Sequence, residues 1–242
     1  MNYQSTRNKG VSISSAEAIA RGISSDGGLF VPERFPQITM AQLEEWGKLD
    51  YIGRAKAVLS LFLSDYSQQE LDDCVKGAYQ GTFENNVPAP LASLSQGVSV
   101  LELWHGPTCA FKDMALQLLP HLLTRAARKT SSAATTVILV ATSGDTGKAA
   151  LEGFKDVEGT QILVFYPRDG VSDMQKLQMT TQEGDNVAVC AVEGNFDDAQ
   201  TGVKRIFTDT AMAQRLAAGN MAFSSANSIN WGRLVPQIVY YI

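Results

Sequence analysis

The sequence contains few of the residues that build disulfide frameworks and metal sites. It has three cysteines and two histidines in 242 residues. The cysteines, Cys74, Cys109 and Cys190, lie far apart and form no CxxC spacing. An odd number of widely separated cysteines indicates a reducing compartment rather than a disulfide scaffold or a zinc site.

The sequence also lacks the long apolar run and the basic excess that membrane and nucleic-acid proteins need. No stretch approaches the roughly 18 apolar residues of a membrane span, and the first residues, MNYQSTRNKG, contain no apolar core of a signal peptide. The net charge of −5 disfavours nucleic acid and anionic membranes as partners. We therefore expect a soluble, cytoplasmic protein.

The remaining composition is that of a globular protein, with 45% hydrophobic and 19% charged residues. Between residues 40 and 81 the apolar side chains recur at helical spacing, and a proline-containing segment, Asn85 to Pro90, then interrupts the pattern. We expect residues 1–92 to form a small, mainly helical subdomain. Residues 93–242 would form a second unit.

The second unit alternates short β-branched runs with helical runs. The expected strands are Val98 to Leu103, Thr136 to Ala141, Gln161 to Tyr166, Val187 to Val192 and Ala222 to Ser224. The expected helices are Phe111 to Lys129, with a kink at Pro120, then Gly147 to Lys155, Asp173 to Gln182 and Asp197 to Ala217. This alternation predicts an α/β fold with an open, mostly parallel sheet and helices on both faces.

Lys112 occupies an informative position in the stretch from Leu101 to Lys129. An apolar run and a Gly-Pro break precede it, and a long helical pattern follows, so it should lie in a first helical turn. The positive end of the helix and burial would both lower the pKa of its amine and favour attack on a carbonyl. Lys112 is therefore a candidate Schiff-base former; the alternative is an exposed lysine paired with Asp113. His105 ends the preceding strand and could bind a ligand or make a structural hydrogen bond.

Two polar segments could bind anions. The strand that ends at Ala141 runs into a hydroxyl-rich glycine turn at 142–147, whose free N–H groups suit a carboxylate. A P-loop is excluded because Thr142 and Ala149 occupy its glycine and hydroxyl positions. The second segment places Asn227, Ser228 and Asn230 before a helix that contains Arg233, a combination that suits phosphate; the alternative is a polar helix cap with a surface arginine.

Five motifs, in order HGPTCAFKD, TSGDTG, YPRDG, GNFDDAQ and SSANSINWGR, resemble the threonine synthase family, in its yeast and enterobacterial branch. The likeness runs from YQSTRN near the start to the last residue. It implies a tryptophan-synthase β-like, fold type II pyridoxal-phosphate enzyme that converts O-phosphohomoserine and water to threonine and phosphate.

The resemblance also implies a role for each site residue. Lys112 would hold the cofactor covalently and move protons, and Asp145 would lie near the cofactor ring. The substrate carboxylate would bind Ser143, Gly144, Thr146 and Gly147, and the substrate phosphate would bind Asn227, Ser228 and Arg233. Many relatives have asparagine where this chain has Asp145, so its carboxylate should be protonated or point outward. The turn Gly194-Asn195-Phe196 is read as a helix cap, because the two acids after it would repel a cofactor phosphate.

Members of this family are considerably longer, and their cofactor-phosphate loop and pyridine-nitrogen contact are expected beyond Ile242. The last residues, from Val235 on, are apolar and lack a polar last turn or a glycine cap. We therefore expect an amino-terminal portion of the enzyme. One alternative is another fold type II enzyme, such as a serine or threonine dehydratase, whose substrate has no phosphate to bind. A second alternative is a non-catalytic fragment that binds anions and self-associates through the apolar surface exposed by truncation.

Overall fold

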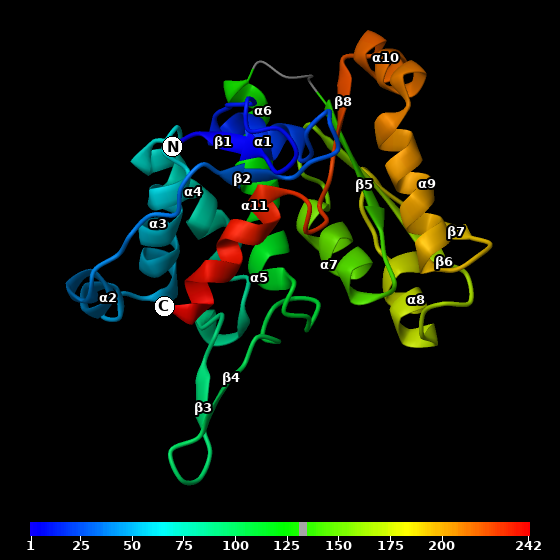
Figure 1. The fold of residues 1–242 in the computed structure, drawn as a ribbon. Coiled ribbons are helices and arrows are strands. Elements are labelled where there is room, and N and C mark those ends of the chain that lie inside the picture. Colours follow the sequence, from blue (N-terminus) through cyan, green and yellow to red (C-terminus); the bar gives the residue numbers. More distant parts are fainter. Residues whose placement is uncertain (131–134) are drawn as a thin grey trace.

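A four-stranded parallel sheet supports the second half of the chain (Figure 1). The computed structural model describes residues 1–130 and 135–242. The sheet has the order β7-β6-β5-β8, and all three pairings are parallel. Its strands are β5 (Thr135–Ala141), β6 (Thr160–Pro167), β7 (Val187–Val192) and β8 (Met221–Ser224). The expected parallel α/β fold is confirmed, and the strand positions agree to within about two residues.

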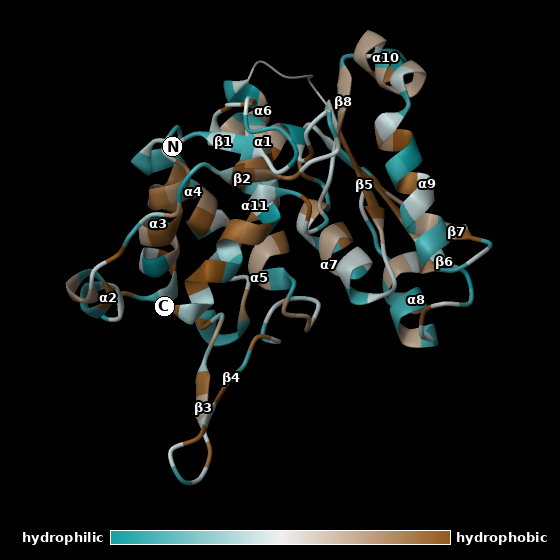
Figure 2. Ribbon diagram, viewed as in Figure 1, coloured by the Kyte–Doolittle hydropathy of each residue, from teal (hydrophilic) through white to brown (hydrophobic). Residues whose placement is uncertain are grey.

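The side chains of β5 alternate between two faces of the sheet, as the pleat requires. Ile138 and Val140 belong to the large core that includes helix α7 (Asp145–Phe154), whereas Leu139 and Ala141 pack with helix α9 (Phe196–Thr208). Helix α8 (Asp173–Thr180) lies beside α7. Figure 2 shows β5 as one of the most hydrophobic parts of the chain, which fits a strand covered on both faces.

The first part of the chain is mainly helical. Its helices are α1 (Ser15–Arg21), α2 (Met40–Trp46), α3 (Tyr51–Phe62) and α4 (Gln68–Tyr79), followed by the 3-10 turn η1 (Glu84–Asn86). A small antiparallel sheet joins β1 (Tyr3–Ser5) to β2 (Phe30–Pro32). Ser14, Thr39, Asp50 and Ser67 each accept a backbone N–H at a helix start, which stabilises these boundaries.

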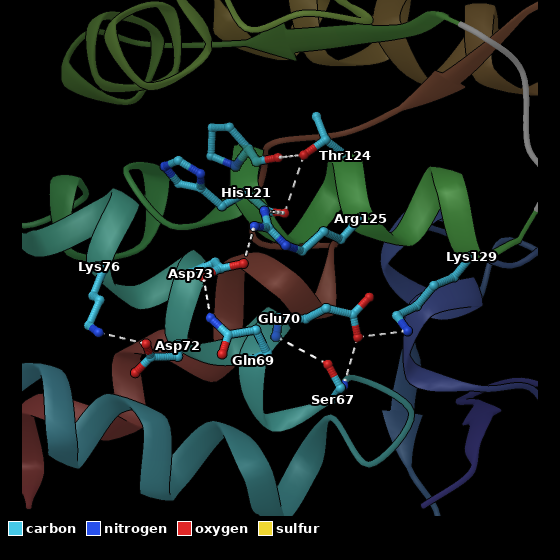
Figure 3. Close-up of polar contacts among 11 residues, drawn as sticks. Ser67, Gln69, Glu70, Asp72, Asp73, Lys76, His121, Thr124, Arg125 and Lys129 are labelled. Carbon is cyan, nitrogen blue, oxygen red and sulfur yellow. Dashed lines mark hydrogen bonds and ion pairs between the residues drawn. The ribbon is translucent and has the colours of Figure 1, made fainter.

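Helices α4 and α6 (Leu119–Lys129) are joined by buried apolar side chains and by ion pairs (Figure 3). Lys129 contacts Glu70 at 2.8 Å, and Arg125 contacts Asp73 at 3.4 Å. Burial acts to raise the pKa of Glu70, but hydrogen bonds from Lys129 and Ser67 outweigh it and hold that pKa below its usual range. These contacts join α6, which follows Lys112 in the chain, to helix α4 in the first part of the chain.

The strand predicted at Val98 to Leu103 does not join the parallel sheet, so this expectation is wrong. Its central residues form β4 (Ser99–Leu101), which pairs antiparallel with β3 (Leu91–Ser93) in a hairpin that projects from the body (Figure 1). Gln96 and Gly97 have positive φ values of 62° and 77° and reverse the chain between the two strands. A turn this short can join only antiparallel neighbours.

Two predicted helices are each divided in two. The helix expected at Phe111 to Lys129 is α5 (Asp113–Leu116) followed by α6, and Pro120 lies in the first turn of α6, where its missing N–H costs nothing. The helix expected at Asp197 to Ala217 ends as α9, and Asp209 then caps α10 (Thr210–Ala218) by accepting from the N–H groups of Ala211 and Met212. The chain closes with α11 (Trp231–Leu234) and the 3-10 helix η2 (Val235–Tyr241).

No helix in the described part of the chain combines the length and the apolar character needed to cross a bilayer.

Candidate functional site

Lys112 lies at the start of α5, with its side chain directed toward the first residue of α7. Its backbone is already helical, with φ −65° and ψ −22°, and its side chain is 18% exposed. The Nζ atom lies 2.9 Å from Asp145 Oδ2 and 4.2 Å from the centre of the Phe111 ring. The ammonium is thus held by a residue 33 positions further along the chain.

The alternative in which Lys112 pairs with its neighbour Asp113 is wrong. Asp113 is fully buried, and its two carboxylate oxygens accept hydrogen bonds from the N–H and the hydroxyl of Thr108. Asp145, by contrast, is 49% exposed at the surface of the site. Its carboxylate is directed at Lys112, and this ion pair is how the structure accommodates an acid at that position.

The turn at 142–147 is shaped by Thr142. Its hydroxyl accepts the N–H groups of Gly144 at 3.0 Å and Gly147 at 2.9 Å, and donates to the Gly144 carbonyl at 3.1 Å. Gly144 adopts φ 152°, and a Cβ there would lie 2.5 Å from the amide of Gln175 in α8. Sequence reasoning treated Thr142 only as a departure from the P-loop, although a threonine just before a helix is itself a signal for this capping role.

Two of the predicted carboxylate-binding residues are accessible on this turn. Ser143 is exposed and Thr146 is half-buried, whereas Gly144 and Gly147 are buried and would act through the backbone. The turn opens α7, whose amino-terminal end carries partial positive charge. The arrangement is therefore suited to a small anion such as a carboxylate.

Arg233 is a buried cation, with 4% of its surface exposed. Within the described part of the chain, its Nε and Nη1 atoms are buried and have no hydrogen-bond partner. Burial lowers the pKa of Arg233, while nearby Tyr240 and Asp145 act in the opposite direction. A buried guanidinium with unused donors is costly unless an anion fills the site, so the alternative of a surface arginine is wrong.

The segment before Arg233 is tied to the sheet. Asn227 donates to the Ala141 carbonyl at 3.3 Å, which places it at the end of β5 beside the 142–147 turn, and Ser228 is exposed next to it. Asn230 is buried and donates to the carbonyls of Ile19 and Ser225, while its side-chain oxygen accepts the N–H of Gly232. Asn230 is therefore a structural cap.

Two further residues have structural roles. His105 lies between two carboxylates, with Nδ1 2.8 Å from Glu84 and Nε2 2.8 Å from Glu102. The hydrogen bond to Glu84 contributes most to raising the pKa of His105, and the hydrogen bond to Glu102 also raises it. These contacts fit a structural role for His105. Asn195 caps α9 and forms a reciprocal capping box with Asp198, as expected for the turn at 194–196.

The structure thus brings together an amine, a turn suited to a small anion and a guanidinium that is only partly paired within the described residues, contributed by three separate segments. Lys112 and Asp145 are in contact, and α11, which carries Arg233, packs against α5, which begins just after Lys112. Such a site fits a ligand that carries both a carbonyl and an anionic group. In residues 1–130 and 135–242, no group of three or more histidine, cysteine, aspartate or glutamate side chains is placed to hold a metal ion.

Comparison with known proteins gives one consistent result. The family model described as threonine synthase N terminus matches residues 2–79. The threonine synthase of Pseudomonas aeruginosa is 41% identical over 244 residues, an alignment that covers 100% of this chain and 50% of that protein. The threonine synthase of Schizosaccharomyces pombe is 39% identical and is covered to 48%.

Solved structures agree with the sequence comparison. The pyridoxal-phosphate-bound threonine synthase of Brucella melitensis superposes with a TM-score of 0.87 at 38% identity, covering 100% of this chain and 50% of that one. The chain spans about half the length of the curated relatives it matches.

Proposed function

Given that the chain belongs to the threonine synthase family, as an amino-terminal portion, we propose that it supplies the lysine and the anion sites of a pyridoxal-phosphate-dependent threonine synthase. The reaction would convert O-phosphohomoserine and water to threonine and phosphate. The observation that carries this proposal is the convergence of Lys112, the 142–147 turn and the buried guanidinium of Arg233.

The residues present fit the cofactor. The Lys112 side chain is 18% exposed and its Nζ is held by Asp145 at 2.9 Å, a position from which it could meet a cofactor aldehyde. When bound, pyridoxal phosphate would supply an electron sink for negative charge at the substrate Cα. Asp145 would hold the lysine in place and lie near the cofactor.

Each anionic group of the substrate has a candidate partner. The α-carboxylate would bind the turn formed by Ser143, Gly144, Thr146 and Gly147. This turn lies at the amino-terminal end of α7, where negative charge is favoured. The phosphate would bind Arg233, with Asn227 and Ser228 beside it at the end of β5. Arg233 would then stabilise the charge that develops as the phosphate departs.

Lys112 would also move the protons. With its amine free, Lys112 Nζ would take the proton from the substrate Cα, and the same atom could serve the later proton loss at Cβ and the return of protons to Cγ and Cα. Water adds at Cβ after the phosphate has left.

Phosphate release from O-phosphohomoserine in the presence of pyridoxal phosphate tests this proposal. We expect release that depends on Lys112 and is lost in Lys112→Ala, and no ammonia release from threonine. Ammonia release without phosphate release would favour the dehydratase alternative. Phosphate release that Lys112→Ala leaves unchanged would contradict the proposed role of the lysine.

We also propose that the projecting β3–β4 hairpin promotes self-association. Leu91 is 69% exposed and Val98 is 56% exposed, and residues 87–101 contain no charged side chain to prevent apolar contact. Light scattering should show a mass that increases with concentration and returns to that of a monomer in Leu91→Lys. A monomer at all concentrations would contradict this.

A further inference from the structure

Asp113 is a buried acid that lies directly beneath the segment carrying Lys112. It has no exposed surface, and both of its oxygens accept from one residue: Oδ2 from the Thr108 N–H at 2.8 Å and Oδ1 from the Thr108 hydroxyl at 2.6 Å. The carboxylate thus closes a loop of six residues that ends one residue after Lys112. The reaction assigned to the site does not use this group.

The loop folds tightly around that carboxylate. A Cβ on Gly106 would lie 2.5 Å from Asp113 Oδ2, so the backbone of the loop packs against the acid. Cys109 has a positive φ of 56° and donates its N–H to the Gly106 carbonyl at 3.1 Å. A non-glycine residue holds this conformation only where its surroundings enforce it, and the Asp113 carboxylate accepts both hydrogen bonds of Thr108 within the turn.

The same loop fixes the backbone of the lysine. The Asp113 N–H donates to the Ala110 carbonyl at 3.0 Å, and the Lys112 carbonyl accepts from Leu116 at 2.8 Å. The backbone on both sides of Lys112 is therefore held by hydrogen bonds, and its Nζ lies 2.9 Å from Asp145.

We infer that Asp113 is a positioning residue, whose carboxylate holds loop 106–112 so that Lys112 Nζ faces Asp145 and the cofactor site. This inference rests on the proposed function for the role of Lys112, but the loop restraint itself does not. Burial raises the pKa of Asp113, and the Thr108 hydrogen bonds act in the opposite direction. Burying this acid therefore opposes folding unless its hydrogen bonds compensate. A group placed only to fill the core would be apolar.

The first test measures how well Lys112 reacts with pyridoxal phosphate in Asp113→Asn and Asp113→Ala. The purified protein is incubated with pyridoxal phosphate and reduced with borohydride, and the label at Lys112 is quantified by peptide mass spectrometry, with exposed Lys48 as internal control. In Asp113→Asn the amide can still accept from the Thr108 N–H and can donate to the Thr108 hydroxyl, so labelling of Lys112 should stay within about twofold of wild type. Asp113→Ala leaves both Thr108 groups without an acceptor. In Asp113→Ala, labelling of Lys112 should fall about tenfold or more, because a small displacement of a reacting group has a large effect on rate. Labelling of Lys48 should not change.

The second test needs no cofactor. Amide hydrogen exchange of residues 108–113 should be faster in Asp113→Ala than in Asp113→Asn and wild type. If Asp113→Ala does not fold, Thr108→Val removes only the hydroxyl hydrogen bond and should lower Lys112 labelling about threefold, with faster loop exchange.

The outcomes separate the two proposals. A folded Asp113→Ala, or Thr108→Val in its place, that labels Lys112 like wild type and shows unchanged loop exchange overturns the positioning role. Wild-type protein that labels Lys112 no more than Lys48 contradicts the proposed function. The exchange comparison then still decides the positioning role, which faster exchange supports and equal exchange overturns.

Discussion

Replacing Arg233 with methionine should stabilise the chain in phosphate-free buffer and abolish its stabilisation by phosphate. Arg233 is 4% exposed, and its Nε and Nη1 are buried and have no partner in the described residues. Methionine keeps much of the apolar stem and removes the unsatisfied donors. Stability and ligand binding should therefore change in opposite directions.

The size of the effect follows from general costs. Each unsatisfied buried donor costs about 1–3 kcal/mol, and the lost attraction to Asp145 and lost packing offset part of the gain, so we expect a net stabilisation of about 1–2 kcal/mol. For a protein of this length each kcal/mol raises Tm by about 2–4 °C. Phosphate at about 100 times its Kd should stabilise the wild type by about 2.7 kcal/mol and leave the variant unaffected.

Urea unfolding with and without phosphate measures both quantities, and Arg128→Met is the matched control because Arg128 is an exposed arginine on α6. The control should retain the stability and the phosphate response of the wild type. An Arg233→Met protein that is less stable than wild type in phosphate-free buffer, or that phosphate stabilises as strongly, would refute the reasoning.

Three further results are expected. His105 has a pKa raised above 6.5 chiefly by Glu84, so its contribution to stability is complete below pH 6.5 and is lost as pH rises through the raised value. Glu84→Gln should reduce this loss of stability in a series of Tm measurements from pH 6 to 9. An identical Tm series in wild type and variant would exclude the effect. Gly144→Ala should destabilise the fold by about 1–3 kcal/mol in thermal unfolding, because φ is 152° and the new Cβ would meet a side chain of α8 at 2.5 Å. Its control, Gly202→Ala in α9, has open space around it and should be neutral or stabilising by about 0.5–1 kcal/mol, and equal Tm changes would contradict the difference. Asp145→Asn removes the carboxylate 2.9 Å from the site lysine, so the pH profile of bound-cofactor absorbance should move to lower pH, and an unchanged profile would count against the contact.

The parallel sheet could be predicted from sequence because its strands are continuous β-branched runs that end at turn residues. Thr136 to Ala141 reads as a strand covered on both faces, and it is one. The run at Val98 to Leu103 has a similar composition, but its partner is the short strand β3, whose three residues give little periodic signal. Local composition indicates a strand without identifying the strand it pairs with.

The site could be predicted in its residue types more readily than in its contacts. The motifs identified Lys112, the 142–147 turn and Arg233, but the partner of Lys112 is Asp145, which is distant in sequence, rather than adjacent Asp113. The burial of Arg233 could not be predicted either, because it depends on η2 and α5 packing around α11. Contacts between separate segments are set by the fold and leave little trace in local sequence.

The visible absorbance of the chain with pyridoxal phosphate, compared between wild type and Lys112→Ala, tests the central claim most directly. The Lys112–Asp145 geometry predicts a cofactor absorbance band in the wild type that is absent in the variant, with both proteins folded by circular dichroism. A band of equal intensity in Lys112→Ala, or none in folded wild type, would contradict the claim that Lys112 and its surroundings form the cofactor-binding centre of this chain.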